Sequence, residues 1–189
     1  MLQIFFILNA PPLTFNKKDL YERESKIRES APFVKAVADS FFLSNQFRKN
    51  HFLYYSTKIQ GKPFVITFDG DNLRYLGPSL FSAAHLLLRV KNHILYPNSK
   101  KGKLTPGISV NEQNSDWIFE QHSEDKFIQV VASEENNLEF RLNNIKQSRV
   151  FTYGFEELPS SINFEKMYVK NLDVDEQVII TNYLLESEK

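Results

Sequence analysis

Apolar residues along this chain form short continuous runs separated by segments with helical spacing. Residues 2–8 are one such run, which predicts a buried strand. A charged stretch follows from Asn16 to Ser30. Phe33, Val37 and Phe41 then recur at every fourth position, which places them on one face of a helix. The pattern therefore predicts a strand followed by a helix with one buried face.

Two further strands and a second helix are predicted next. The segments 52–59 and 64–68 are rich in β-branched and aromatic residues, and a Gln60-Gly61-Lys62 turn joins them. Pro78 then opens a helix, since proline is tolerated in a first turn where its missing N–H has no helical partner. The apolar stripe of this helix comprises Leu80, Ala83, Ala84, Leu87 and Leu88.

The second half of the chain predicts four short strands and a closing helix. The strands are expected at 108–110, 127–132, 149–153 and 166–169, and the helix at 174–186. Strands that alternate with helices indicate a single α/β domain, residues 1–189, with a largely parallel sheet. Ligands of such open sheets bind outside the carboxyl ends of the strands, here the loops after Val131, Tyr153 and Val169.

Composition excludes several kinds of site. The chain has no cysteine, and its four histidines show no HxH or HExxH spacing, so no metal site is expected. There is no P-loop, GxGxxG fingerprint or GxSxG elbow, and six glycines do not supply a glycine-rich phosphate cradle. These absences remove the motif support for kinase, dinucleotide-dependent and serine hydrolase chemistry.

Charge and hydropathy indicate where the protein acts. The apolar run at the N-terminus is too short to span a bilayer and lacks the features of a secretion signal, so we expect a cytoplasmic protein without membrane contact. The formal net charge is zero, which argues against a strongly electrostatic, non-specific nucleic-acid binder. A local basic surface remains compatible with that balance.

The segment KAVADSFFLSNQFRKN, residues 35–50, begins as an apolar helix and ends with hydroxyl, amide and cationic groups. Ser44, Arg48 and Lys49 are candidates for RNA contact, because Arg offers a forked donor pattern and Lys a point charge for phosphate. The alternative is an ordinary helix C-terminus, which favours cations. Asp39 is a candidate for orienting a substrate, or else a solvated carboxylate.

Two loops carry further candidates. Lys100, Lys101 and Lys103 form a cationic cluster that either contacts RNA phosphates or simply lies in solvent. Gly154 directly follows an apolar strand and permits close approach of a ligand to the backbone, although a turn glycine would read the same way.

Taken together, several segments resemble one RNA methyltransferase family. AVADSFFLSNQFRKN, FVITFDGDNLRYLGP and KLTPGISV are similar, in this order, to segments of the archaeal tRNA pseudouridine-54 N1-methyltransferases, the TrmY group of the SPOUT superfamily. The resemblance implies a SPOUT-type α/β fold whose last forty residues form a trefoil knot. It also implies methyl transfer from S-adenosyl-L-methionine (SAM) to N1 of a pseudouridine in tRNA or other structured RNA, carried out by a homodimer.

The resemblance also implies site residues. Three loops would cradle SAM, largely through backbone groups; mapped by position they include Val130, Gly154, Tyr168, Val169, Lys170, Asn171, Leu172 and Asp173. The second loop keeps one glycine of a normally glycine-rich run. The family carries an Arg and an Asp before its first long helix, and here Arg28 either replaces them with a shifted register or that site is lost. Arg28 and Asp39 are thus the catalytic candidates, and the alternative function is a catalytically degenerate SPOUT-fold homodimer that binds RNA or serves as a scaffold.

Overall fold

The computed structural model describes residues 3–21, 27–44, 46–98, 103–133 and 150–186. Seven strands form one sheet in the order β6-β5-β4-β1-β8-β7-β9. The five strands from β4 to β9 in this order run parallel to their neighbours, whereas β5 and β6 are antiparallel. This arrangement confirms the predicted α/β fold with a largely parallel sheet. The strands are β1 Ile4–Asn9, β4 His51–Ile59, β5 Lys62–Asp69, β6 Ile108–Asn111, β7 Phe127–Ser133, β8 Val150–Tyr153 and β9 Phe164–Lys170.

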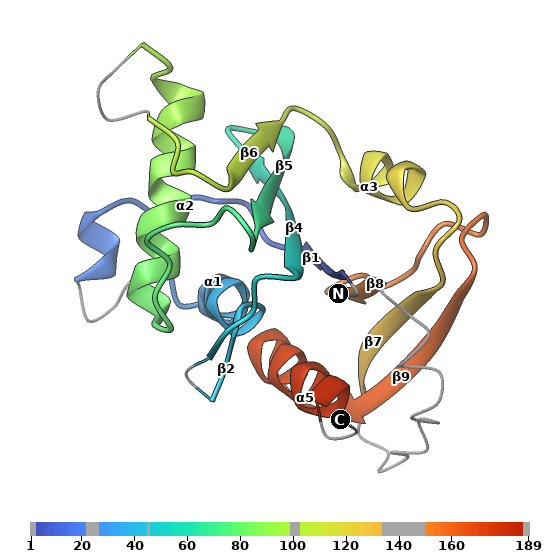
Figure 1. The fold of residues 1–189 in the computed structure, drawn as a ribbon. Coiled ribbons are helices and arrows are strands. Elements are labelled where there is room, and N and C mark those ends of the chain that lie inside the picture. Colours follow the sequence, from blue (N-terminus) through green and yellow to red (C-terminus); the bar gives the residue numbers. More distant parts are fainter. Residues whose placement is uncertain (1–2, 22–26, 45, 99–102, 134–149, 187–189) are drawn as a thin grey trace.

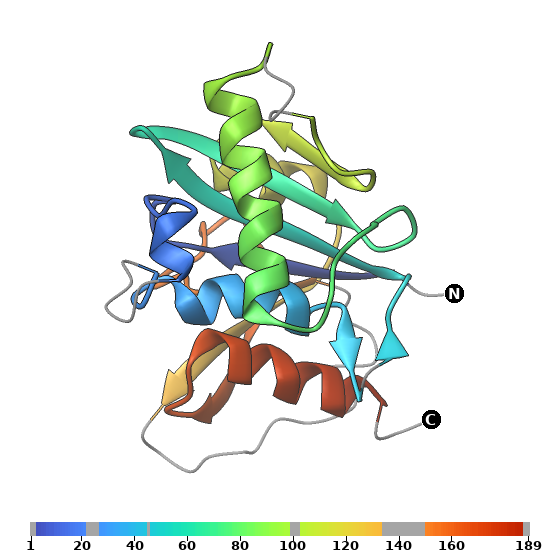
Figure 2. The ribbon, with the colours of Figure 1, turned by 90° about the vertical axis from the view of Figure 1, so that its left-hand side faces the viewer.

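Three helices cover one face of the sheet, and Figures 1 and 2 show them as a single layer. They are α1 Ala31–Asp39, α2 Leu80–Leu95 and α5 Val174–Glu186. A short 3-10 helix, η1 Lys18–Leu20, precedes α1. Within α2, Ser79 is the N-cap, and its hydroxyl accepts a hydrogen bond from Ser82 N over 3.2 Å. Pro78 therefore lies just before this helix and not in its first turn.

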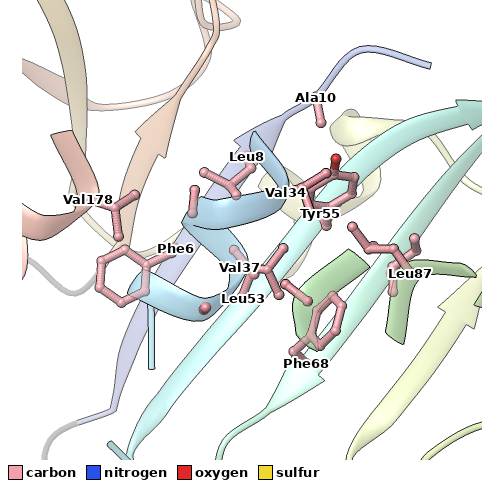
Figure 3. Close-up of a cluster of buried hydrophobic side chains, with 14 of the residues drawn as sticks. Phe6, Leu8, Ala10, Val34, Val37, Leu53, Tyr55, Phe68, Leu87 and Val178 are labelled. Carbon is pink, nitrogen blue, oxygen red and sulfur yellow. The ribbon is translucent and has the colours of Figure 1, made fainter. Parts of the chain in front are cut away.

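The main core lies between this helical layer and the sheet (Figure 3). Phe6 of β1 and Leu53 of β4 are fully buried, as are Val34 and Val37 on one face of α1. Full burial of such a side chain stabilises the fold by about 1.5–3 kcal/mol. The spacing of apolar residues that predicts the first helix thus corresponds to its contact with the sheet.

The opposite face of the sheet has a smaller apolar cluster. Side chains alternate across a strand, so Ile7 of β1 faces away from Phe6. Ile7 packs with Phe127 and with Ile118 of α3, the helix Ser115–Gln121, which lies on this second side in Figure 1. Among the described residues, this face is covered by one short helix and the opposite face by three longer ones.

The segment after α1 differs from the predicted continuation of the helix. The helix ends at Asp39, and β2 Phe42–Leu43 pairs antiparallel with β3 Gln46–Phe47. The chain reverses at Ser44, whose φ of 50° is compatible with a tight turn. The rings of Phe42 and Phe47 stand edge to face at 5.2 Å. Phe41, the last residue of the predicted apolar face, therefore lies just beyond the helix, and Phe42 stabilises a small hairpin.

The trefoil knot stays a prediction, because residues 134–149 between β7 and β8 lie outside the described part of the chain. Within the described ranges, no helix combines the length and the apolar character needed to cross a bilayer.

Candidate functional site

The parallel strands β1, β8, β7 and β9 lie side by side, so their carboxyl ends share one edge of the sheet. The register pairs Leu8 with Tyr153, and Val131 with Tyr168. Three segments that are distant in sequence thus meet at this edge: the end of β7, Gly154 after β8, and residues 168–173. We refer to these segments, together with Asn9 at the end of β1, as the carboxyl edge. All the predicted cofactor residues belong to it.

Gly154 is fixed tightly at the carboxyl edge. Its φ is +74°, in the region that favours glycine, and its carbonyl accepts a hydrogen bond from Asn9 Nδ2 over 3.1 Å. A Cβ atom at this position would lie 2.8 Å from Asn9 O and 2.9 Å from Cε1 of Phe33. The close approach that glycine permits is therefore made by the protein's own β1 and α1.

Gln129, which the sequence did not single out, supports the loop after β8. This side chain is 1% exposed, and its Nε2 donates to the carbonyl oxygen of Phe155 over 2.9 Å. Its Oε1 is buried and has no hydrogen-bond partner among the described residues. An unpaired buried acceptor costs free energy unless a donor reaches it. Gln129 therefore fixes the loop backbone and leaves one acceptor near the carboxyl edge.

Two backbone groups of the loop after β9 form hydrogen bonds with side chains at the start of α5. Gln177 Nε2 donates to Leu172 O over 2.9 Å, and Asp173 N donates to Glu176 Oε2 over 3.0 Å. The second contact is one half of a capping box, which satisfies a helix N-terminus. Lys170 and Asn171 are exposed, whereas these backbone groups of Leu172 and Asp173 already have partners.

The remaining cofactor candidates divide by exposure. Val130 and Val169 are almost fully buried, so neither presents surface to a ligand in this structure. Tyr168, in contrast, exposes a large part of its ring beside them. A ligand at this edge would accordingly meet the exposed candidates, which are Gly154, Tyr168, Lys170, Asn171 and Asp173.

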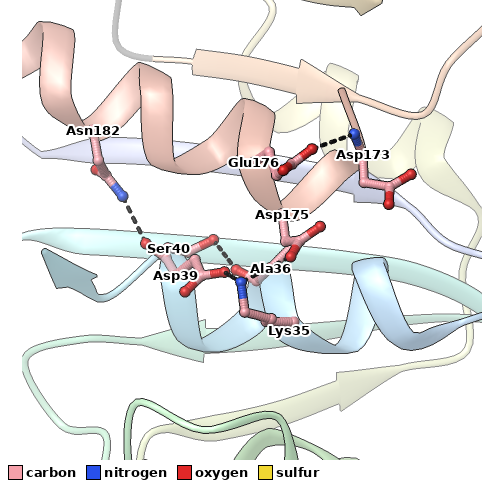
Figure 4. A network of polar contacts seen from close by, with 8 residues as sticks. All are labelled: Lys35, Ala36, Asp39, Ser40, Asp173, Asp175, Glu176 and Asn182. Atoms are coloured by element: carbon pink, nitrogen blue, oxygen red, sulfur yellow. Dashed lines mark hydrogen bonds and ion pairs between the residues drawn. The ribbon is translucent and has the colours of Figure 1, made fainter. Parts of the chain in front are cut away.

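Asp39 belongs to a polar network between α1 and α5 (Figure 4). Lys35 Nζ lies 3.2 Å from Asp39 Oδ2 and 2.8 Å from Asp175 Oδ2. Burial raises the pKa of Asp39 to about 6, although the charge of Lys35 acts in the opposite direction. The hydrogen bond that Lys35 donates to Asp175 raises the pKa of Lys35, which burial alone would lower. One ammonium group thus serves two carboxylates that come from distant parts of the chain.

The predicted RNA-contacting residues differ in whether they are paired within the chain or exposed to solvent. Arg48 forms an ion pair with Glu186 at the end of α5, through its Nη2 and Glu186 Oε1. Ser44 and Lys49 are exposed around the β2-β3 hairpin, and Lys103 is exposed before β6. Lys100 and Lys101 lie outside the described residues. The structure therefore gives Arg48 a partner within the chain and leaves three candidates open to solvent.

The two catalytic candidates are not brought together. Arg28 is exposed in the turn before α1, and Asp39 is the last residue of that helix. A helix of nine residues is about 13 Å long. Phe33, in the first turns of α1, contacts Gly154, so the Arg28 end of the helix is the one next to the carboxyl edge.

A second polar cluster lies on the opposite face of the sheet. His122 Nδ1 lies 2.9 Å from Asp125 Oδ2, and His122 Nε2 lies 3.2 Å from the hydroxyl of Tyr54. Burial raises the pKa of the Tyr54 hydroxyl. Sequence spacing gives no signal for this cluster, because Tyr54 is on β4 and His122 follows α3. Across the described ranges, no group of three or more His, Cys, Asp or Glu side chains is placed to hold a metal ion.

No protein-family model and no curated protein matches this chain.

Proposed function

We propose that this chain is a SAM-dependent RNA methyltransferase of the SPOUT type that methylates N1 of a pseudouridine in tRNA. In this proposal it acts as a cytoplasmic homodimer. The observation that supports it is the shared carboxyl edge, which gathers the end of β7, Gly154 and residues 168–173. These are the three segments that the resemblance assigns to the cofactor, and an open parallel sheet binds ligands at such an edge.

The residues of the edge offer a partial fit to SAM. Gln129 is buried and donates to Phe155 O, so it fixes the backbone of the loop after β8 beside the proposed cofactor. Lys170 and Asn171 are exposed residues, and Tyr168, which is also exposed, lies next to them in the sequence. We assign Tyr168, Lys170 and Asn171 to cofactor binding and Gln129 to positioning the loop. When bound, SAM supplies the electrophilic methyl group, and no metal is required.

The protein's own residues would then orient the RNA and the reacting nitrogen. We place Arg28 at the target nucleotide, because it is exposed at the end of α1 that contacts Gly154. A guanidinium group there can bind a phosphate of the substrate strand and hold the base in line with the methyl group. Asp39 lies at the other end of the helix, so we assign it to the network that joins α1 to α5.

A second function is favoured by the contacts of Gly154. Asn9 and Phe33 already occupy the space next to this glycine, and the Leu172 and Asp173 backbone groups are engaged within α5. A SPOUT-type homodimer that binds RNA without catalysis accounts for both observations. The two functions share an RNA partner and differ in the cofactor.

Transfer of labelled methyl groups tests the proposal. The protein is incubated with SAM labelled in its methyl group and with a tRNA transcript that contains pseudouridine, and the nucleosides are analysed afterwards. The proposal predicts labelled 1-methylpseudouridine, and Arg28→Gln should reduce its formation by at least tenfold. Binding of the transcript without any labelled nucleoside would instead support the non-catalytic RNA-binding function.

A further inference from the structure

A pocket of about 310 Å³ lies between the segment after β1 and the helix α2. Its polar lining includes Asn16, Lys17, His85, Arg89 and Lys91. None of these residues belongs to the carboxyl edge. The volume is at the lower end of the range of about 300–1,000 Å³ for small-molecule sites, which suits a group the size of one nucleotide.

Lys91 forms one wall of this pocket and fixes its shape. Its Nζ donates to Thr14 O and to Phe15 O, each over 2.8 Å. Burial lowers the pKa of Lys91, and the nearby Asp19 opposes that effect. Asp19 is itself buried, and its Oδ2 accepts a hydrogen bond from Asn16 N over 2.7 Å. Lys91 therefore holds the segment against α2.

Lys17 and Arg89 leave their charges available to a ligand. Both side chains are exposed, and neither forms a salt bridge within the described part of the chain. Because Asp19 is buried and hydrogen-bonded, it does not present a carboxylate at the surface of the pocket. An anion that enters the pocket thus meets the fork of Arg89 and the point charge of Lys17, the two cations best suited to phosphate.

A pair of exposed aromatic rings stands next to the pocket. Tyr21 is 67% exposed and Phe81 is 50% exposed, and their rings are stacked with centroids 6.5 Å apart and planes inclined by 15°. The hydroxyl of Tyr21 lies 3.3 Å from Nε2 of His85, which lines the pocket. The aromatic pair is therefore connected to the pocket through His85.

We propose that this pocket and the Tyr21-Phe81 pair form a binding site for a single RNA strand. A backbone phosphate lies between Lys17 and Arg89, and a neighbouring base stacks on the aromatic pair. Cationic grooves combined with aromatic platforms are the general means of binding single-stranded nucleic acid. The inference rests on the proposed function only in taking RNA as the partner, and it names a surface separate from the carboxyl edge.

The test measures binding of the full chain to a short, fluorescently labelled, single-stranded RNA by anisotropy. The variant Lys17→Gln/Arg89→Gln should bind at least tenfold more weakly, and so should Tyr21→Ala/Phe81→Ala, because stacking on an aromatic side chain contributes about that much per base. The matched control is Lys166→Gln/Arg74→Gln, which removes one exposed lysine and one exposed arginine that do not line the pocket and form no salt bridge within the described ranges. It should bind within twofold of the unmodified protein.

Three results would overturn the inference. The first is equal RNA affinity of the unmodified protein and both pocket variants, and the second is equal weakening of RNA binding by the charge variant and by its control. The third is displacement of the RNA by micromolar uridine monophosphate, which would assign the pocket to a free nucleotide. Calorimetry of the same variants with SAM separates this inference from the proposed function. Loss of RNA binding with SAM binding intact concerns the pocket, whereas absence of SAM binding in the unmodified protein concerns the methyltransferase proposal alone.

Discussion

The side chain of Asn182 donates a hydrogen bond from Nδ2 to the backbone oxygen of Asp39 over 2.7 Å, and both residues are buried. This contact joins the closing helix α5 to the last residue of α1, across 143 positions of sequence. Arg48 reaches Glu186 one turn further along α5. The hairpin after α1 and the end of α1 are thereby held against the same helix.

Replacing Asn182 by alanine should destabilise the fold by about 1–3 kcal/mol, because the Asp39 carbonyl would lose this buried donor. Urea denaturation followed by circular dichroism measures the change. Tyr183→Ala is the matched control, since Tyr183 lies on the same helix and is largely exposed. Equal destabilisation by the two substitutions would show that the Asn182 contact contributes nothing specific.

The pKa of Asp39 predicts a pH dependence of stability. Its pKa is raised from 3.8 to about 6 in the folded state, so the folded protein holds this proton more tightly than the unfolded chain. This group therefore makes the fold less stable as pH rises from about 4 to about 6. The expected loss is about 1–2 kcal/mol, since the carboxylate keeps some contact with solvent.

Thermal unfolding across this pH range, compared between the unmodified protein and Asp39→Asn, checks the prediction. The variant cannot ionise at this position, so its stability should change less between pH 4 and pH 6 than that of the unmodified protein. Parallel pH profiles would mean that the charge of Asp39 is not disfavoured in the fold.

Gly154→Ala should be more destabilising than Gly61→Ala. Both glycines have φ near +80°, so both substitutions bring a similar backbone strain of about 1–2 kcal/mol. A Cβ at Gly61 meets no atom within 4 Å, whereas at Gly154 it meets Asn9 O and Phe33. We expect a further loss of about 1–3 kcal/mol from this overpacking, measured as the difference between the two denaturation curves. Equal losses would show that the neighbours of Gly154 adjust freely.

Arg48 and Lys49 are adjacent cations, but Arg48 is paired with Glu186 whereas Lys49 is exposed. Substituting each residue in turn therefore distinguishes a structural role from a role in RNA binding. Arg48→Gln should destabilise the protein by about 1 kcal/mol or more, because the Glu186 carboxylate is only about one-third exposed and would lose its partner. Lys49→Gln should leave stability unchanged, since Lys49 is exposed. Denaturation and RNA binding are measured on both variants. If Arg48→Gln lowers the stability of the protein but leaves its RNA affinity unchanged, the role of Arg48 is purely structural.

Most of the fold could be predicted because long apolar segments determine it. Residues 52–59 and 64–68 pair as the predicted hairpin, and the predicted closing helix at 174–186 matches α5. The β2-β3 hairpin was missed because its strands have two residues each and imitate the end of a helix. Helix α3 was missed because its seven residues carry too few turns for a periodic signal.

The sites were harder to predict because they join distant positions. Gly154 and residues 168–173 could be selected from the ends of predicted strands, but the contact of Gly154 with Phe33 depends on how α1 packs. Lys35 and Asp175 are 140 positions apart, and no local pattern relates them. The pocket beside α2 likewise combines residues 15–17 with residues 85–92.

Calorimetric titration of the full chain with S-adenosylhomocysteine, the demethylated product of SAM, tests the central claim most directly. The methyltransferase proposal predicts saturable binding of one ligand per chain. It also predicts that Tyr168→Ala weakens this binding at least tenfold, because the Tyr168 side chain is exposed at the carboxyl edge and is assigned to the cofactor. Absence of binding to the unmodified protein at millimolar ligand would contradict the claim, and unchanged affinity in the variant would show that the cofactor lies elsewhere.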